Sequence, residues 1–229
     1  MKKIWFVALF GVLIVASLAC NATSKLPSID LSTSTPEANK IVFQDDFSDT
    51  STGWPSSTDA DGIVDYDSGS YRIRVDTIGA DKKGIDIWAH PGQDIKGDVR
   101  VEVDATKIGG PDSNDMGVIC RYSKKNDKYN FYYFLITSDG YVAIAKMKDS
   151  HPTFISGEQM EESSAIKKTQ TNHIRGDCIG KKMTLYVNDE QVATATDSDF
   201  TGGDVGLIAG TFGTTGVDIH FDDFVVRQP

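Results

Sequence analysis

Several segments of the chain alternate apolar and charged residues, as a strand does when one of its faces is buried. The charged side chains point away from the apolar side of their strands, and aromatic residues occur on neighbouring segments. Aromatic faces together with planar hydrogen-bonding side chains suit the binding of a sugar. The candidate ligand contacts are Trp88, Arg100, Glu102, Asp104, Arg121, Tyr132 and Tyr133. The alternative is a solvated outer face with cross-strand ion pairs, which Arg72 and Arg74 would share.

Two of the three cysteines, Cys120 and Cys178, fall on strand faces that we assign to the core. In an oxidising compartment such a pair can form a disulfide, which would stabilise the fold by roughly 4 kcal/mol for a loop of this length. Two buried free thiols are the alternative. Neither version is catalytic, because a redox pair usually has the closer Cys-x-x-Cys spacing.

The N-terminus has the features of a secretion signal. Lys2 and Lys3 precede an apolar run from Ile4 to Leu18, which is short for a membrane span. The run ends in Val-Ala-Ser-Leu-Ala-Cys at residues 15–20, which resembles a bacterial lipobox. We therefore predict a signal peptide over residues 1–19 and diacylation of Cys20, for example with palmitate, since two acyl chains suffice for stable anchoring. An ordinary signal peptide cut nearby, or an uncleaved anchor, is the alternative.

Residues 20–40 are rich in Ser, Thr and Pro and have no sustained hydrophobic period, so they are predicted to be a disordered tether. Residues 41–229 form the predicted folded domain. The net charge is −10, and it becomes −12 without residues 1–19, which contain two lysines and no acidic residue. This acidity argues against nucleic acid as a partner, because no basic stripe offsets the repulsion of phosphate. The acidity could equally serve solubility alone.

The folded part is predicted to be built of antiparallel strands joined by tight turns. Residues 171–192 alternate as a hairpin that turns at Gly180 and Lys181, and Asp139-Gly140 predicts a second hairpin turn. Strands at this spacing need a second sheet to cover their apolar face, which indicates a β-sandwich. Residues 151–168 show no strand period, and one short helical turn is expected there.

The runs HIRGDCIGKKMTLYVNDEQVATATD, GDVGLIAG and FDDFVV resemble the concanavalin A-like/laminin G-like jelly rolls, and more closely a group of bacterial exported lipoproteins of unassigned function. The likeness extends from about Ile41 to Val226. It implies an all-β, antiparallel two-sheet jelly roll. Folds of this kind carry lectins, glycosidases, adhesion modules and scaffolds, so the likeness does not fix the function.

The resemblance also implies a structural calcium site. In related carbohydrate-binding jelly rolls the first and last strands pair, and an aspartate of the last strand binds Ca²⁺, which prefers several oxygen ligands. Asp46 and Asp223 are the candidates here, with Asp45 and Asp222 behind them. The alternative is that these aspartates face solvent or cap turns.

Jelly-roll glycosidases of the laminarinase kind carry Glu-x-Asp-x-x-Glu on one strand. In this chain Glu102 and Asp104 match the first two acids, but Lys107 occupies the third position and cannot serve as the paired carboxylic acid. If this alignment holds, that mechanism is absent, so no catalytic residue is assigned. The four histidines lack the spacing of a transition-metal site.

Together these patterns predict an exported bacterial lipoprotein, anchored to a membrane and facing away from the cytoplasm. Its domain is expected to be a non-enzymatic binding module that recognises glycans through one face of the sandwich. The alternatives are a glycoside-processing enzyme of the same fold and an envelope scaffold or protein-interaction domain. The glycan and enzyme hypotheses require an aromatic-lined groove, whereas the scaffold hypothesis predicts a face filled by side chains or covered by residues 151–168.

Overall fold

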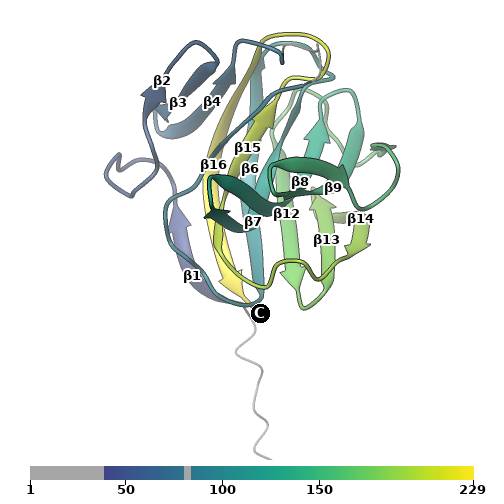
Figure 1. Ribbon diagram of the computed structural model, residues 1–229. Coiled ribbons are helices and arrows are strands. Elements are labelled where there is room, and N and C mark those ends of the chain that lie inside the picture. Colours follow the sequence, from purple (N-terminus) through teal and green to yellow (C-terminus); the bar gives the residue numbers. More distant parts are fainter. Residues whose placement is uncertain (1–38, 80–83) are drawn as a thin grey trace, which may run out of the picture. The chain divides into compact units, whose positions relative to one another are not determined.

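The domain consists of two antiparallel β-sheets. The computed structural model describes residues 39–79 and 84–229, and Cys20 lies outside them. The described residues form sixteen strands and no helix (Figure 1). They accordingly contain no helix long and apolar enough to cross a membrane. The predicted all-β, antiparallel two-sheet architecture is confirmed.

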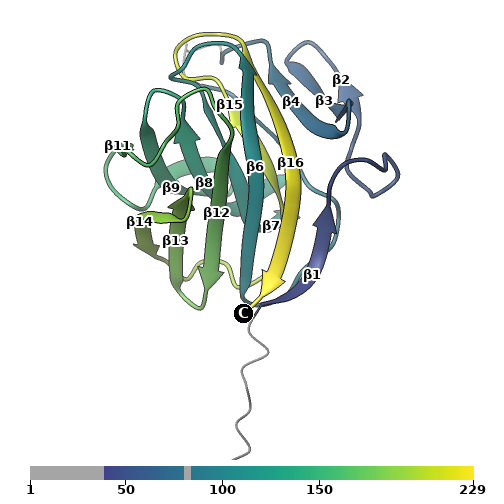
Figure 2. The ribbon, with the colours of Figure 1, turned by 180° about the vertical axis from the view of Figure 1, so that it is seen from behind.

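Nine strands form the sheet in front in Figure 2, in the order β14-β13-β12-β6-β16-β4-β3-β2, with β1 beside β16. Asp45 of β1 pairs with Phe224 of β16, which confirms that the first and last strands are partners. The bounds are β1 (Lys40–Asp45), β2 (Ser57–Thr58), β3 (Gly62–Asp67), β4 (Ser70–Val75), β6 (Val99–Gly109), β12 (Asn172–Ile179), β13 (Lys182–Val187), β14 (Glu190–Thr196) and β16 (Val217–Gln228).

Seven strands form the other sheet, in the order β10-β9-β8-β7-β15-β5, with β11 paired to β9. The bounds are β5 (Asp86–Ala89), β7 (Asp115–Lys125), β8 (Lys128–Thr137), β9 (Tyr141–Lys148), β10 (His151–Phe154), β11 (Glu161–Glu162) and β15 (Asp204–Gly210). The expected helical turn in residues 151–168 is wrong. Asp149 and Ser150, both at positive φ, make a tight turn that returns the chain along β9 as β10.

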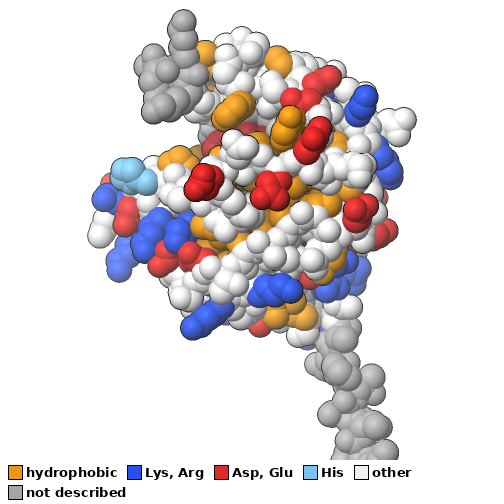
Figure 3. Space-filling model, turned by 90° about the vertical axis from the view of Figure 1, so that its right-hand side faces the viewer, with side chains coloured by type: hydrophobic (Ala, Val, Ile, Leu, Met, Phe, Trp, Pro, Cys, Tyr) orange, Lys and Arg blue, Asp and Glu red, His pale blue; other side chains and the backbone are white. Residues whose placement is uncertain are grey.

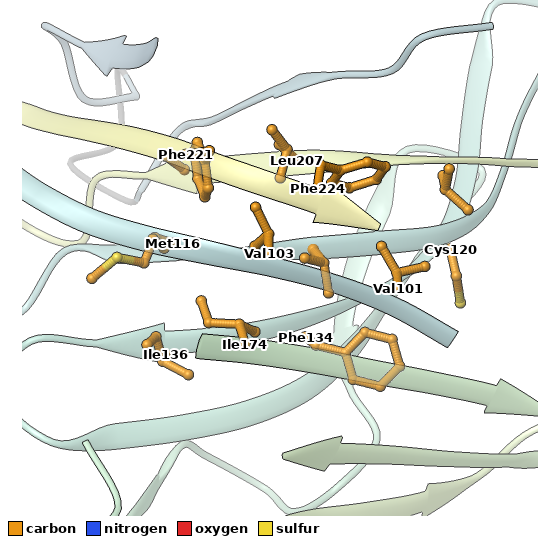
Figure 4. Close-up of a cluster of buried hydrophobic side chains, with 14 of the residues drawn as sticks. Val101, Val103, Met116, Cys120, Phe134, Ile136, Ile174, Leu207, Phe221 and Phe224 are labelled. Carbon is orange, nitrogen blue, oxygen red and sulfur yellow. The ribbon is translucent and has the colours of Figure 1, made fainter. Parts of the chain in front are cut away.

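The core lies between the two sheets and is built from alternate residues of their strands. In Figure 4 side chains from both sheets point toward one another, and all the labelled ones are fully buried. The first sheet supplies Val101, Val103, Ile174, Phe221 and Phe224, and the second supplies Met116, Cys120, Phe134, Ile136 and Leu207. One covalent link joins the layers: Cys120 of β7 and Cys178 of β12 form the predicted disulfide, with their Cα atoms 6.8 Å apart.

Candidate functional site

The seven-stranded sheet carries a second hydrophobic cluster on its outer face, away from the core. In β8 the alternation places Phe131, Tyr133 and Leu135 on this face, while Tyr132 and Phe134 enter the core. Trp88 of β5 packs against Phe131, with ring centroids 5.3 Å apart. A strand that is apolar on both faces needs cover on both, so this outer face differs from an ordinary solvated one.

Two aspartates lie side by side on the same face, at one end of the sheet. Gly210 of β15 pairs with Asp86 of β5 on one side and with Asp115 of β7 on the other. A methyl group at Gly210 would overlap the carboxylate of Asp86 and lie 2.9 Å from that of Asp115. The two carboxyl groups therefore share the space that a side chain on the middle strand would take.

The environment of this pair disfavours two negative charges. Asp115 is 6% exposed, and its Oδ1 has no hydrogen-bond partner within the described part of the chain. Burial, and then the neighbouring Asp86 carboxylate, raises the pKa of Asp115 well above its usual value. Burial also raises the pKa of Asp86 to about 6. Since Asp86 keeps some contact with solvent, we regard Asp115 as the more strongly perturbed of the two.

The aspartates lie in a hollow of about 230 Å³ with apolar walls. Its lining consists of Gly84, Asp86, Asp115, Tyr133, Leu135, Pro152, Thr153, Phe154, Thr211 and Phe212. Phe154 and Phe212 also line an adjoining hollow of about 400 Å³. Phe212 is 61% exposed, which is unusual for a residue with so large an apolar side chain. The site thus combines an acidic floor with aromatic walls.

Local hydrogen bonds hold the walls in place. The buried Asn114 accepts from the Phe212 N–H (2.8 Å) and donates to the carbonyls of Thr214 and Gly216 (both 3.3 Å), which positions the loop that carries Phe212. The Thr211 N–H donates to the carbonyl of Ile85 (3.1 Å), which ties the start of β5 to the end of β15. These hydrogen bonds fix the backbone on two sides of the hollow.

The middle of the outer face is filled rather than open. Ile119, Phe131 and Ile208 are fully buried there, and Phe154 and Met160 from residues 151–168 pack against this cluster. This is the arrangement that the scaffold hypothesis predicts for the face as a whole. The two hollows at its end supply the aromatic-lined space that the glycan and enzyme hypotheses require.

The seven predicted ligand contacts do not lie together. Trp88 and Tyr133 belong to the outer face of the seven-stranded sheet, and Tyr133 lines the acidic hollow. Tyr132 points into the core, and its hydroxyl donates a hydrogen bond to the carboxylate of Asp197 (2.6 Å). Lys146 forms an ion pair with Asp197, and Lys148 forms one with Asp199. Figure 3 shows positive and negative side chains intermixed at one margin of the side that carries β9, β13 and β14.

The outward orientation predicted for Arg121 is wrong. A bulge in β7, with Arg121 at φ +57°, turns this side chain inward, and it is 2% exposed. Its guanidinium donates to the carboxylate of Asp98 (3.1 Å) and to three backbone carbonyls, those of Cys178, Gly180 and Phe200. Arg121 therefore connects strand ends inside the fold.

The other three candidates lie on β6 of the nine-stranded sheet and take part in cross-strand pairs. Arg100 donates to Asp177 (3.0 Å), Glu102 lies 3.6 Å from Arg227, and Asp104 lies 2.7 Å from the ring of His173. These pairs match the alternative considered from the sequence. A ligand role for Arg100, Glu102 and Asp104 stays a prediction.

The calcium candidates come close together where β1 ends and where a bulge interrupts the middle of β16. Asp45, Asp46, Asp49 and Asp223 line one pocket. The carboxylates of Asp45 and Asp46 already cap turns: Asp45 accepts from the Phe47 N–H (2.8 Å), and Asp46 accepts from the Ser48 N–H (3.1 Å). Among the described residues no group of three or more His, Cys, Asp or Glu side chains could hold a metal ion. Calcium binding by Asp46 and Asp223 stays a prediction that chelation tests.

The acidic hollow itself was not predicted. Asp86 and Asp115 each begin a strand, at the positions where the alternation allows a polar residue. Asp86 and Asp115 could have been identified as neighbours only from the way β5 and β7 pair with β15. Sequence periodicity does not supply this register.

No family model and no curated protein matches this chain. Solved structures do match. The chain is similar to the carbohydrate binding module CBM66 from Bacillus subtilis, with a TM-score of 0.58 and 20% identity over 77% of this chain and 96% of that one. It is similar to a Bacillus licheniformis beta-glucanase, with a TM-score of 0.58 and 12% identity over 82% and 97%. A third match is a Bacillus subtilis protein of unknown function with a galectin-like fold, with a TM-score of 0.54 and 11% identity over 83% and 98%. At these identities the matches establish the fold alone, a concanavalin A/galectin-like jelly roll, and the predicted concanavalin A-like architecture is confirmed.

Proposed function

We propose that this protein is a membrane-anchored, non-enzymatic glycan-binding lipoprotein whose ligand occupies the acidic hollow on the seven-stranded sheet. The observation that carries the proposal is that Asp86 and Asp115 lie side by side in a hollow that Tyr133, Phe154 and Phe212 also line. Carboxylates accept hydrogen bonds from sugar hydroxyls, and aromatic rings cover the apolar faces of sugar rings. Similarity in fold to a carbohydrate-binding module and to a glucanase supports the ligand class.

A glycoside-processing enzyme is the second candidate, and the same two carboxyl groups favour it. Retaining glycosidases use two carboxyl groups about 5 Å apart, one as nucleophile and the other as acid and base, on either side of the scissile bond. Here both carboxyl groups lie side by side over Gly210, on the same side of the hollow, and not on either side of a bound ligand. This arrangement suits binding better than bond cleavage.

The test is a glycan-array screen of the full chain in detergent, with two matched variants. Phe212→Ala removes an exposed ring from the hollow, and Ile108→Ala removes a comparably exposed side chain on β6 of the other sheet. We expect hits that weaken about tenfold in Phe212→Ala and persist in Ile108→Ala. Silence across the array with the fold intact would move the proposal to a scaffold or interaction domain. Release of shortened sugars from a bound glycan would favour the enzyme.

Anchoring through Cys20 is a separate part of the proposal and has its own test. In a bacterial host the wild-type chain is expected in the membrane fraction and Cys20→Ser in the soluble or secreted fraction, because acyl chains supply the membrane affinity. A membrane-bound Cys20→Ser chain would instead indicate an uncleaved apolar anchor.

A further inference from the structure

The acidic hollow has a chemistry more specific than that of a general sugar site. We propose that Asp86 and Asp115 bind the ammonium group of an amino sugar, so that the ligand is a glycan with a free, unacetylated hexosamine. This inference rests on the proposed function and names the substrate class of the same site.

The charge of the hollow is unbalanced among the described residues. Two carboxyl groups line it, and no described lysine, arginine or histidine does. The adjoining hollow adds a third acid, Asp139, again without a described cation in its lining. Two carboxylates held this closely repel each other, so an ionised pair needs either a shared proton or a positive ligand.

Asp115 supplies the second observation. Asp115 is 6% exposed and lines the hollow, and its Oδ1 has no described donor within hydrogen-bond distance. A buried acceptor left unsatisfied costs about 1 to 3 kcal/mol, and more when it is charged. An ammonium group offers three N–H donors and can serve both carboxylates at once, whereas a hydroxyl offers one.

The walls favour the same ligand. Tyr133, Phe154 and Phe212 line the hollow, and the faces of aromatic rings attract cations. The volume of about 230 Å³ is below the usual range for drug-sized ligands, which suits one terminal sugar residue. The adjoining hollow of about 400 Å³ shares Phe154 and Phe212 and would take the next residues of the chain. An N-acetyl group would remove the charge and bring an apolar methyl group toward the carboxylates.

The experiment compares three trisaccharides by calorimetry with the full chain in detergent and EDTA: β-1,4-linked glucosamine, N-acetylglucosamine and glucose. It uses the wild type and Lys82→Gln/Lys83→Gln, because these lysines adjoin Gly84 in the sequence and carry amines of their own. We expect glucosamine trimer to bind at least about tenfold more tightly than the other two in at least one of these proteins. Equal affinity for all three in both proteins would overturn the inference and leave the glycan proposal standing.

A matched pair of variants locates the effect. Asp115→Asn keeps the shape of the side chain and removes its charge, and Glu190→Gln does the same on exposed β14 of the other sheet. The amine preference is expected to fall below about threefold in Asp115→Asn and to remain in Glu190→Gln. A preference unchanged in Asp115→Asn would overturn the assignment to this pair. If no trimer binds and the glycan array is also silent, the proposed function itself fails.

Discussion

Asp86 and Asp115 flank Gly210 on neighbouring strands, and their carboxyl groups occupy the space above it. Because burial raises the pKa of both groups, the folded protein holds a proton that the unfolded chain releases near pH 4. Where the folded state binds more protons, the free energy of unfolding falls as pH rises. The pair therefore destabilises the fold progressively from about pH 4 upward, through the raised pKa values.

It follows that Asp115→Asn should stabilise the protein at neutral pH. We expect the free energy of unfolding to rise by about 1 to 3 kcal/mol at pH 7, because a neutral amide replaces a poorly solvated carboxylate. The gain should shrink toward zero at pH 4, where the carboxyl group is already protonated. Thermal melting at both pH values, with Glu190→Gln as control, measures this. A loss of stability at pH 7 would show that the carboxylate has a partner that compensates its burial.

Gly176 of β12 faces the ring of Phe134 across the sandwich. A Cβ at this position would lie 2.5 Å from one ring carbon and 2.7 Å from another, although φ there is ordinary. Since Phe134 is fully buried, it has no room to retreat, and overpacking usually costs about 1 to 3 kcal/mol. Gly176→Ala is expected to lower the free energy of unfolding by that amount.

Gly109→Ala is the matched control for Gly176→Ala. Its Cβ would meet only the Asp218 side chain at 3.6 Å, an ordinary contact, so the stability should change by less than about 0.5 kcal/mol. Urea unfolding of the two variants gives the comparison. Equal effects would mean that the Phe134 contact is not the cause of the loss at Gly176.

The strands of this fold could be predicted where one face is apolar and the other polar. Residues 99–106 alternate without exception, and the structure places their even positions outside and their odd positions in the core. The same rule failed at Arg121, because a bulge shifts the period by one residue and no composition signal marks it. No strand was predicted over Gly62–Asp67, where the structure has β3.

The site could be predicted only in part, because it depends on strand order. Trp88 and Tyr133 were found as aromatic candidates, and both lie on the outer face of the seven-stranded sheet. Asp86 and Asp115 are 29 positions apart in the sequence and become neighbours only through Gly210, almost 100 positions further on. Contacts of this kind follow from the register of non-local strands, which a local pattern does not contain.

Asp197 responds to pH in the opposite direction to the acidic pair. Burial raises its pKa, but hydrogen bonds from Lys146, from the Tyr132 hydroxyl and from the Asp199 N–H outweigh this and lower it to about 2. A lowered pKa stabilises the fold above the unfolded value near 4, and this contribution is lost as pH falls toward 2. Asp197→Asn should therefore cost about 1 to 2 kcal/mol at pH 7 and less at pH 3. Melting temperatures measured for both proteins from pH 7 to pH 3 test this. If Asp197→Asn costs the same stability at every pH, the charge of Asp197 is not what stabilises the fold.

The Cys120–Cys178 disulfide joins the two sheets across a separation of 58 residues. In the chain-entropy model a loop of this length stabilises by about 4 kcal/mol, which corresponds to roughly 10 °C in the melting temperature of a domain this size. Cys120→Ala/Cys178→Ala should melt lower by that amount, and reduction of the wild type should reproduce the effect while leaving the double variant unchanged. Cys20 is the only other cysteine, so the unreduced, denatured chain should show at most one free thiol, and none if Cys20 is acylated. Two or more free thiols would show that the bond does not form in the protein as isolated, and the buried sulfurs would then contribute through packing alone.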